Sequence, residues 1–258
     1  MKMIYMDNAG RDRGAGVCVV ASVLIDVDEQ WVPVAREMER LKAEFFPEEA
    51  KAGFTIHTSD IFGGAKSFGS SRYSLDHRLA VLTAVSTMIT EFEIPVSIGY
   101  SRSRATEVSE KGLPMRSTGA VDGDHSFALM QALAASDRVM RESFPGEYAM
   151  VIAEDVHGRR EQLLNAFLVM RLRDFVDTLP AEYRDLFPLR RIVGSLHFVA
   201  KGGDHLLQAA DVCAFVARRY AEGFRGGSDL LAVLLKERPP EEIQTASAVA
   251  FVARRKLA

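Results

Sequence analysis

The sequence predicts an α/β domain built on a mixed β-sheet, and three observations support this prediction. Two short segments near the N-terminus, at residues 1–7 and 17–26, carry the apolar, β-branched or bulky side chains typical of strands that pair as a hairpin. Helical and strand-like patterns then alternate along the chain. Only helical patterns follow residue 204. This order is typical of a mixed sheet flanked by helices.

The composition is that of a globular protein. The 258 residues are 48% hydrophobic and 26% charged, which excludes a disordered polymer or a fibrous repeat. No apolar run approaches the roughly 18 residues of a bilayer span, so no membrane partner is expected. A net charge of −3 implies that any nucleic-acid contact relies on local basic patches or metal ions. Without repeats or linker-like stretches, the favoured organisation is one domain spanning residues 1–258.

The cysteines and the N-terminus predict a cytoplasmic protein. Cys18 and Cys213 lie in apolar stretches and lack CxxC spacing, which indicates buried thiols in a reducing compartment rather than disulfides or a zinc site. The first ten residues, MKMIYMDNAG, contain no apolar core of a signal peptide.

The first half of the chain is expected to contain two helices and two further strands after the N-terminal hairpin. Helical spacing of Trp31, Val34, Met38 and Leu41 predicts a helix that ends before Pro47. The other elements expected in this half are a strand at 54–62, a Gly/Ser-rich loop at 63–74, a helix at 75–92, a strand at 94–102 and a polar loop at 101–124.

The second half is expected to alternate helix and strand before a helical end. The predicted helices lie at 125–143, 159–179 and 204–222, and the predicted strands at 147–155 and 191–200. Residues 1–222 would form the core, and residues 228–258 a C-terminal helical extension interrupted by Pro239 and Pro240. That extension is expected to cap the core or to form a homodimer contact, with core packing favoured.

A carboxylate in an apolar helix is the first sign of a site. On an ideal helix, Asp204, Gln208 and Asp211 fall within about 60° of one another, and apolar residues cover nearly all the remaining surface. Such a helix is buried, so Asp211 must face a partner, a cleft or a metal ion. A buried salt bridge with an arginine is the structural alternative.

Further acids follow two predicted buried strands. Asp7 follows the first strand, and Glu154 and Asp155 follow the strand at 147–155. Acids at the ends of neighbouring strands converge, and their repulsion is relieved by a divalent cation; oxygen ligands favour Mg²⁺ or Mn²⁺. Such sites support phosphodiester cleavage. Taken singly, each acid is better explained as a turn residue or a helix N-cap, and Asp155 could cap the helix after it, but the three positions together favour a metal site.

Histidine and basic residues supply candidates for proton transfer and substrate binding. His57 is a candidate general base or water-orienting group, and a hydrogen-bonded core histidine is an equal alternative. The loop at 63–74 carries two cations, Lys66 and Arg72, that would contact phosphate, although a plain surface loop is favoured. The arginines nearest the acids, which would contact phosphate, are Arg11, Arg13 and Arg159.

Four motifs together resemble the bacterial and phage "domain of unknown function 3800" family, whose members look like ribonuclease H-like nucleases. The resemblance spans about residues 1–222, and the first and last motifs carry most of it. The motifs are IYMDNAG at 4–10, FTIHTSD at 54–60, AED at 153–155 and LQAAD at 207–211.

The resemblance implies a ribonuclease H-like fold with acids gathered around a divalent metal ion. It nominates Asp7, Glu154 or Asp155, and Asp211 as ligands, with His57 nearby. Two positions depart from the family pattern, because Asn8 and Thr55 stand where the family has glutamates. Loss of the second glutamate is expected to weaken metal binding or to leave one ion instead of two.

The preferred hypothesis is a metal-dependent nuclease in which Asp7, Glu154 or Asp155, and Asp211 hold Mg²⁺ or Mn²⁺ and water attacks phosphorus. His57 or Lys66 would assist. The first alternative is a catalytically degenerate relative that binds nucleic acid or a protein partner. The second is a phosphohydrolase that uses the same metal chemistry on a small molecule.

Overall fold

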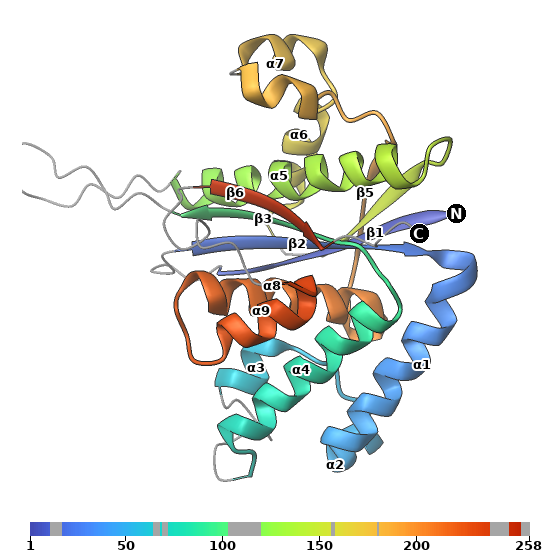
Figure 1. The fold of residues 1–258 in the computed structure, drawn as a ribbon, viewed down its shortest axis with the longest axis vertical. Helices are drawn as coiled ribbons and strands as arrows, with labels where there is room; N and C mark the ends of the chain where they lie inside the picture. Colours follow the sequence, from blue (N-terminus) through green and yellow to red (C-terminus); the bar gives the residue numbers. More distant parts are fainter. Residues whose placement is uncertain are drawn as a thin grey trace, which may run out of the picture.

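The computed structural model describes residues 1–10, 17–63, 68, 72–102, 120–155, 158–179, 181–237 and 248–253. Within these residues, six strands form one mixed sheet with helices on both faces (Figure 1). The predicted α/β class with a mixed sheet is thereby confirmed. The strands are β1 (Lys2–Ala9), β2 (Val17–Asp26), β3 (Val96–Arg102), β4 (Ala149–Glu154), β5 (Ile192–Val199) and β6 (Ala248–Ala253).

The strand order across the sheet is β5-β4-β1-β2-β3-β6. The hairpin partner β2 runs antiparallel to β1 and to β3, and β6 runs antiparallel to β3. On the other side of β1, strands β4 and β5 run parallel to it. Strands β1, β4 and β5 therefore end at the same edge of the sheet, and this edge carries the candidate site.

Helices pack against both faces and divide the core in two (Figure 1). One face is covered by α8 (His205–Ala221), with α1 (Val27–Phe45), α2 (Pro47–Lys51), α3 (Thr58–Gly63), α4 (Leu75–Glu91) and α9 (Gly227–Leu235) around it. The other face is covered by α5 (Ala120–Ser143), with α6 (Arg160–Val169) and α7 (Arg173–Thr178) beyond it. No helix in these described ranges is both long enough and apolar enough to cross a membrane.

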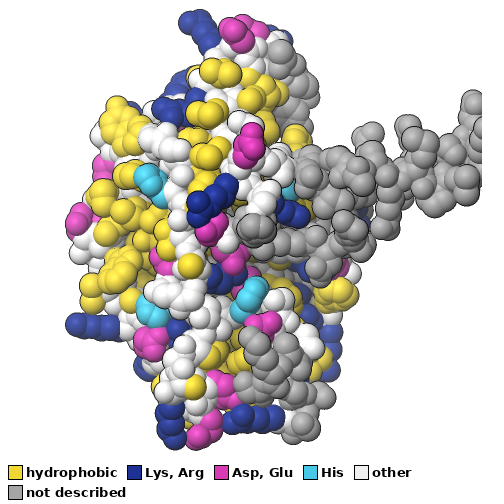
Figure 2. Space-filling model, turned by 180° about the vertical axis from the view of Figure 1, so that it is seen from behind, with side chains coloured by type: hydrophobic (Ala, Val, Ile, Leu, Met, Phe, Trp, Pro, Cys, Tyr) yellow, Lys and Arg dark blue, Asp and Glu magenta, His cyan; other side chains and the backbone are white. Residues whose placement is uncertain are grey.

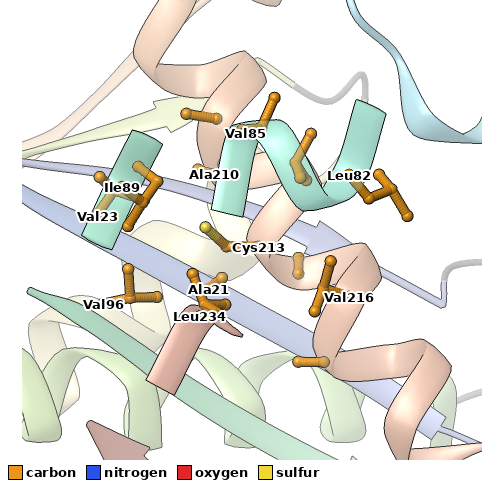
Figure 3. Close-up of a cluster of buried hydrophobic side chains, with 14 of the residues drawn as sticks. Ala21, Val23, Leu82, Val85, Ile89, Val96, Ala210, Cys213, Val216 and Leu234 are labelled. Carbon is orange, nitrogen blue, oxygen red and sulfur yellow. The ribbon is translucent and has the colours of Figure 1, made fainter. Parts of the chain in front are cut away.

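Alternation along β1 assigns its side chains to the two cores. Ile4 and Met6 belong to the cluster on the α5 face, and Tyr5 belongs to the cluster on the α8 face. Figure 3 shows part of the α8-side core, where Val23 and Val96 of the sheet lie close to Cys213. Both cysteines are buried and neither is in a disulfide, as the sequence predicts.

The predicted strand at 54–62 is wrong. Residues 54–57 pair with no strand, and α3 begins at Thr58. The reason is that side chains of α8 take the hydrogen bonds that a neighbouring strand would offer. The backbone N–H of Ile56 donates to Gln208 at 2.9 Å, and that of Thr58 donates to Asp211 at 2.8 Å.

The predicted helix at 159–179 is divided. Helix α6 ends at Val169 and α7 begins at Arg173. Between them the backbone makes hydrogen bonds to the third residue before, as in a 3₁₀ turn, and Leu172 has an extended backbone. Helix α5 begins at Ala120, within the loop predicted for 101–124; residues 103–119 of that loop lie outside the described residues.

The C-terminal helical extension is correct only for its first part. Helix α9 is present, but residues 248–253 form β6 rather than a helix. The segment AVAFVA fits a strand period, and the edge of β3 offers it a row of hydrogen-bonding groups.

The start of β5 is fixed by a carboxylate of α5. Asp137 is fully buried, and its Oδ1 accepts hydrogen bonds from the backbone N–H groups of Arg190, Arg191 and Ile192 at 2.8, 2.6 and 3.3 Å. An irregularity follows, because Ala149 pairs with Ile192 whereas Val151 pairs with Leu196. Gly194, with φ of +75°, lies within it.

Helix α5 approaches β3 so closely that only glycine fits at Gly99. A Cβ there would lie 2.0 Å from the carbonyl oxygen of Ala128 and 2.6 Å from the amide nitrogen of Ala132. We expect Gly99→Ala to lower the free energy of unfolding by about 3 kcal/mol or more, because the helix backbone must move away from the sheet. Urea denaturation measures this loss. Gly63→Ala is the control, since its Cβ would meet nothing within 4 Å; equal stability of the two variants would contradict the packing argument.

Candidate functional site

Three carboxylates surround the ammonium group of Lys201. Its Nζ lies 2.5 Å from Oδ2 of Asp7, 3.4 Å from Oε1 of Glu154 and 3.5 Å from Oδ1 of Asp211. These four residues are called the Lys201 cluster below. Folding thus brings together Asp7 and Asp211, which are about 200 residues apart in the sequence.

The sheet and α8 position each member of the cluster. Met6 of β1 pairs with Ala153 of β4, so the next residues, Asp7 and Glu154, lie side by side. Glu154 ends β4, but Asp7 lies within β1 and does not follow it as predicted, because β1 continues to Ala9 along β2. Lys201 follows the end of β5, in a 3₁₀ turn that leads into α8. Asp204 caps that helix by accepting hydrogen bonds from Leu206 N and Leu207 N, and it is not a member of the cluster.

Three of the four residues of the Lys201 cluster are buried, and Glu154 is partly buried. Asp7 is 4% exposed, Asp211 3% and Lys201 6%. Three carboxylates and one ammonium carry a net charge of −2 when all are ionised. Burial and the charge of Asp211 raise the pKa of Asp7 well above its ordinary value, against the opposing effect of Lys201. Burial lowers the pKa of Lys201, but Asp211, Asp7 and Glu154 outweigh this effect and raise it, so the lysine is charged.

Asp211 differs from Asp7 because more groups stabilise its ionised form. Burial raises its pKa, but interactions with His57 and Lys201 and the hydrogen bond from Thr58 N outweigh burial and lower it. Nδ1 of His57 lies 3.5 Å from Oδ2 of Asp211 and 3.3 Å from Oγ of Ser59. Both contacts use Nδ1, and the side chain is 43% exposed. Nε2 is therefore the nitrogen that a substrate would meet.

Asn8 and Arg159 belong to a neighbouring network on the α5 side of β1. Strand alternation directs Asn8 away from Asp7, although its backbone N–H donates to Asp7 Oδ1 at 2.7 Å. Its amide nitrogen lies 2.9 Å from Nε2 of buried His125, and Arg159 Nη1 lies 2.8 Å from Nδ1 of the same ring. Arginine can only donate, so Nδ1 of His125 is the acceptor in its contact with Arg159.

The remaining predicted site residues fall in different places. Of the two neighbouring acids, Glu154 contacts Lys201, whereas Asp155 forms a bidentate ion pair with Arg160. Arg72 lies 2.6 Å from buried Glu49. Thr55 donates its hydroxyl to Gly202 O at 3.1 Å. Lys66, Arg11 and Arg13 lie outside the described residues.

The donor chemistry of the cluster fits a divalent cation. Three carboxylates supply hard oxygen ligands, and a doubly charged ion would offset the negative charge that they carry when ionised. As placed, however, the carboxylates surround an ammonium, and no three His, Cys, Asp or Glu side chains among the described residues are arranged to hold a metal ion. The residues that would hold the ion are Asp7, Glu154 and Asp211.

Lys201, and the hydrogen bond made by Gln208, were not predicted from the sequence. A lysine in the turn sequence AKGGD is normally solvated, so nothing local to that turn indicates that it contacts the acids. Gln208 lies on the same helical face as Asp211, which was visible in the sequence, but its hydrogen bond to Ile56 N was not.

Comparisons with known proteins give no match: no family model, no curated protein and no solved structure matches this chain. The interpretation of the site therefore rests on its own residues. Those residues combine buried oxygen donors, a buried ammonium and a half-exposed histidine at one edge of the sheet.

Neutralising the two aspartates is expected to change stability in opposite directions in metal-free protein. The folded state holds the proton of Asp7 above the ordinary aspartate pKa of about 4, so stability falls as pH rises from about 4 through the folded pKa. Asp211 has a lowered pKa, so it adds stability above about pH 4 that is lost as pH falls through the folded pKa.

At pH 7 with a chelator present, we therefore expect Asp7→Asn to raise the free energy of unfolding by about 1 kcal/mol and Asp211→Asn to lower it by about 3 kcal/mol. Urea denaturation at pH 7 and at pH 4 measures both effects, and the difference between the variants should shrink at the lower pH. A shift of both variants in the same direction at pH 7 would refute the assignment of the two environments.

Proposed function

We propose that this chain is a divalent-cation-dependent phosphodiesterase that acts on nucleic acid. The observation that carries the proposal is the convergence of three carboxylates from β1, β4 and α8 on one buried position. Buried acids of like charge are costly unless a cation neutralises them, and proteins use such sets of carboxylates to bind Mg²⁺ or Mn²⁺ for phosphoryl chemistry.

The sheet supports a ribonuclease H-like fold. The order β3-β2-β1-β4-β5, with β2 antiparallel to its neighbours and β4 and β5 parallel to β1, is the arrangement expected of such a sheet. The acids at the ends of β1 and β4 and on α8 also occupy the positions that the resemblance to the "domain of unknown function 3800" family nominates.

In the proposed mechanism Asp7, Glu154 and Asp211 would hold the cation. A bound cation would supply activation of water and stabilisation of the leaving oxygen. His57 is oriented through Nδ1 by Asp211, so Nε2 is the atom that would accept a proton from the attacking water. Lys201 offsets part of the carboxylate charge that would otherwise repel phosphate.

Substrate contacts would depend on individual cations rather than on a basic surface. Figure 2 shows acidic, basic and histidine side chains mixed along the middle of one face, beside hydrophobic ones. Of the three arginines predicted nearest the acids, Arg159 is the described one; it follows the end of β4 by five residues, and its Nη1 lies 2.8 Å from Nδ1 of His125. Phosphate backbones are recognised by such arginines, and their contribution weakens as salt concentration rises.

A non-catalytic binding module is the second candidate, because one observation favours it. Lys201 already occupies the centre of the acids, so the cluster is partly neutralised without a metal ion. In that case the acids would stabilise the sheet edge, and nucleic acid or a protein would bind without being cleaved. Metal-dependent turnover separates the two candidates.

We expect the protein to cleave single- or double-stranded DNA or RNA in the presence of Mn²⁺. Gel electrophoresis of labelled substrates measures the rate of cleavage. Asp7→Asn and Asp211→Asn should each lower the rate at least about 100-fold, because each removes a charged oxygen ligand. Glu48→Gln, which removes an exposed carboxylate paired with Lys51, is the control and should keep wild-type activity. Equal rates in all variants would refute the proposal, and cleavage of nucleotides alone would indicate a small-molecule phosphohydrolase.

The neighbouring acids Glu154 and Asp155 are expected to differ in the same assay. Glu154→Gln removes a carboxylate of the Lys201 cluster, so the rate should fall about 100-fold. Asp155→Asn breaks the ion pair with Arg160 and should cost less than about 10-fold. The reverse order of effects would assign Asp155, rather than Glu154, to the cation.

A further inference from the structure

Both the backbone and the side chain of Lys201 are held in place. Its carbonyl oxygen accepts hydrogen bonds from Asp204 N at 3.0 Å and from Gln208 Nε2 at 3.5 Å, which ties the turn to the start of α8. Its ammonium lies among three carboxylates, and the side chain is buried. Lys201 is therefore an integral part of the cluster and not a surface residue that lies nearby.

The spacing of the carboxylates suits an ammonium and not a small metal ion at the same point. Two of the three oxygens lie 3.4 and 3.5 Å from Nζ. Mg²⁺ binds oxygen at about 2.1 Å, so these two oxygens would have to move inward by about 1.3 Å around an ion at that position. The ammonium and a metal ion cannot occupy the position together. The flexible four-carbon stem of lysine allows Nζ to move while the backbone stays in place.

We propose that Lys201 is the resident cation of the metal-free protein, and that its ammonium must leave the centre of the carboxylates before a divalent ion binds there. The inference rests on the proposed function, since it concerns the same cluster. Lysine and metal ion then compete for Asp7, Glu154 and Asp211. The lysine keeps the acids together when no metal is present, and it lowers the affinity of the site for metal ions.

The test measures Mn²⁺ binding by the full chain, with free Mn²⁺ followed by electron paramagnetic resonance. We expect Lys201→Met to bind Mn²⁺ at least 10-fold more tightly than the wild type, because the competing charge is gone. Lys201→Arg keeps the charge and should bind no more tightly than the wild type. Lys42→Met is the matched control: it removes another buried lysine, which pairs with Glu39 outside the cluster, and should leave Mn²⁺ affinity unchanged.

Thermal denaturation gives a second, independent measurement. In a chelator, Lys201→Met and Lys201→Gln should melt at lower temperature than the wild type, because the carboxylates of Asp7, Glu154 and Asp211 lose the ammonium that they share. Saturating Mn²⁺ should raise their melting temperatures by more than it raises that of the wild type. Variants that stay unfolded in Mn²⁺ would overturn the inference, since the metal ion is expected to replace the lost charge.

The outcomes separate this inference from the proposed function. Unchanged or weaker Mn²⁺ binding by Lys201→Met overturns the competition, even if the wild type cleaves nucleic acid. Tighter binding by Lys201→Met supports the competition, even if no variant cleaves any substrate, and the proposed function alone would then fail.

Discussion

The structure depends on one constraint: two buried carboxylates and a partly buried one meet around the ammonium of Lys201. Burying an isolated charge lowers the free energy of unfolding by several kcal/mol. An acid in the interior must therefore contact a cation or bind a proton. Here the ends of β1 and β4, the turn after β5 and the middle of α8 each supply one charged group. These elements must be in place together for any of the charges to be neutralised. The cluster therefore forms only when the whole sheet edge is folded, and no single local segment can form it.

Much of the sheet follows from local patterns. The apolar segments of β1 and β2 predict the hairpin, and the apolar surface around Asp211 predicts a buried α8 with an acid that needs a partner. Convergence of Asp7 and Asp211 follows from the same physical argument, because a buried carboxylate must meet a group that offsets its charge. These predictions succeed where burial alone decides the structure.

Other parts depend on distant partners that no local pattern reveals. The segment at 54–57 has a strand-like pattern, but its amides bond to side chains of α8 instead of a strand. The segment at 248–253 fits both a helix and a strand, and the open edge of β3 decides between them. Lys201 stands in a glycine-rich turn of ordinary appearance, and only the neighbouring strand ends reveal the charge that it faces.

The irregularity in β5 determines which residue reaches the acids. Between Ala149 and Val151, strand β4 advances by two residues while β5 advances by four, from Ile192 to Leu196. In an unbroken ladder the partner of Glu154 would be His197, and the position now held by Lys201 would go to Val199, a side chain without charge. Because the insertion is an even number of residues, the inward and outward sides of the strand are preserved beyond it. The two extra residues near Gly194 thus place Lys201, the one cation of the four-residue cluster, where a valine would otherwise lie. The faces to which the side chains of β5 point stay the same.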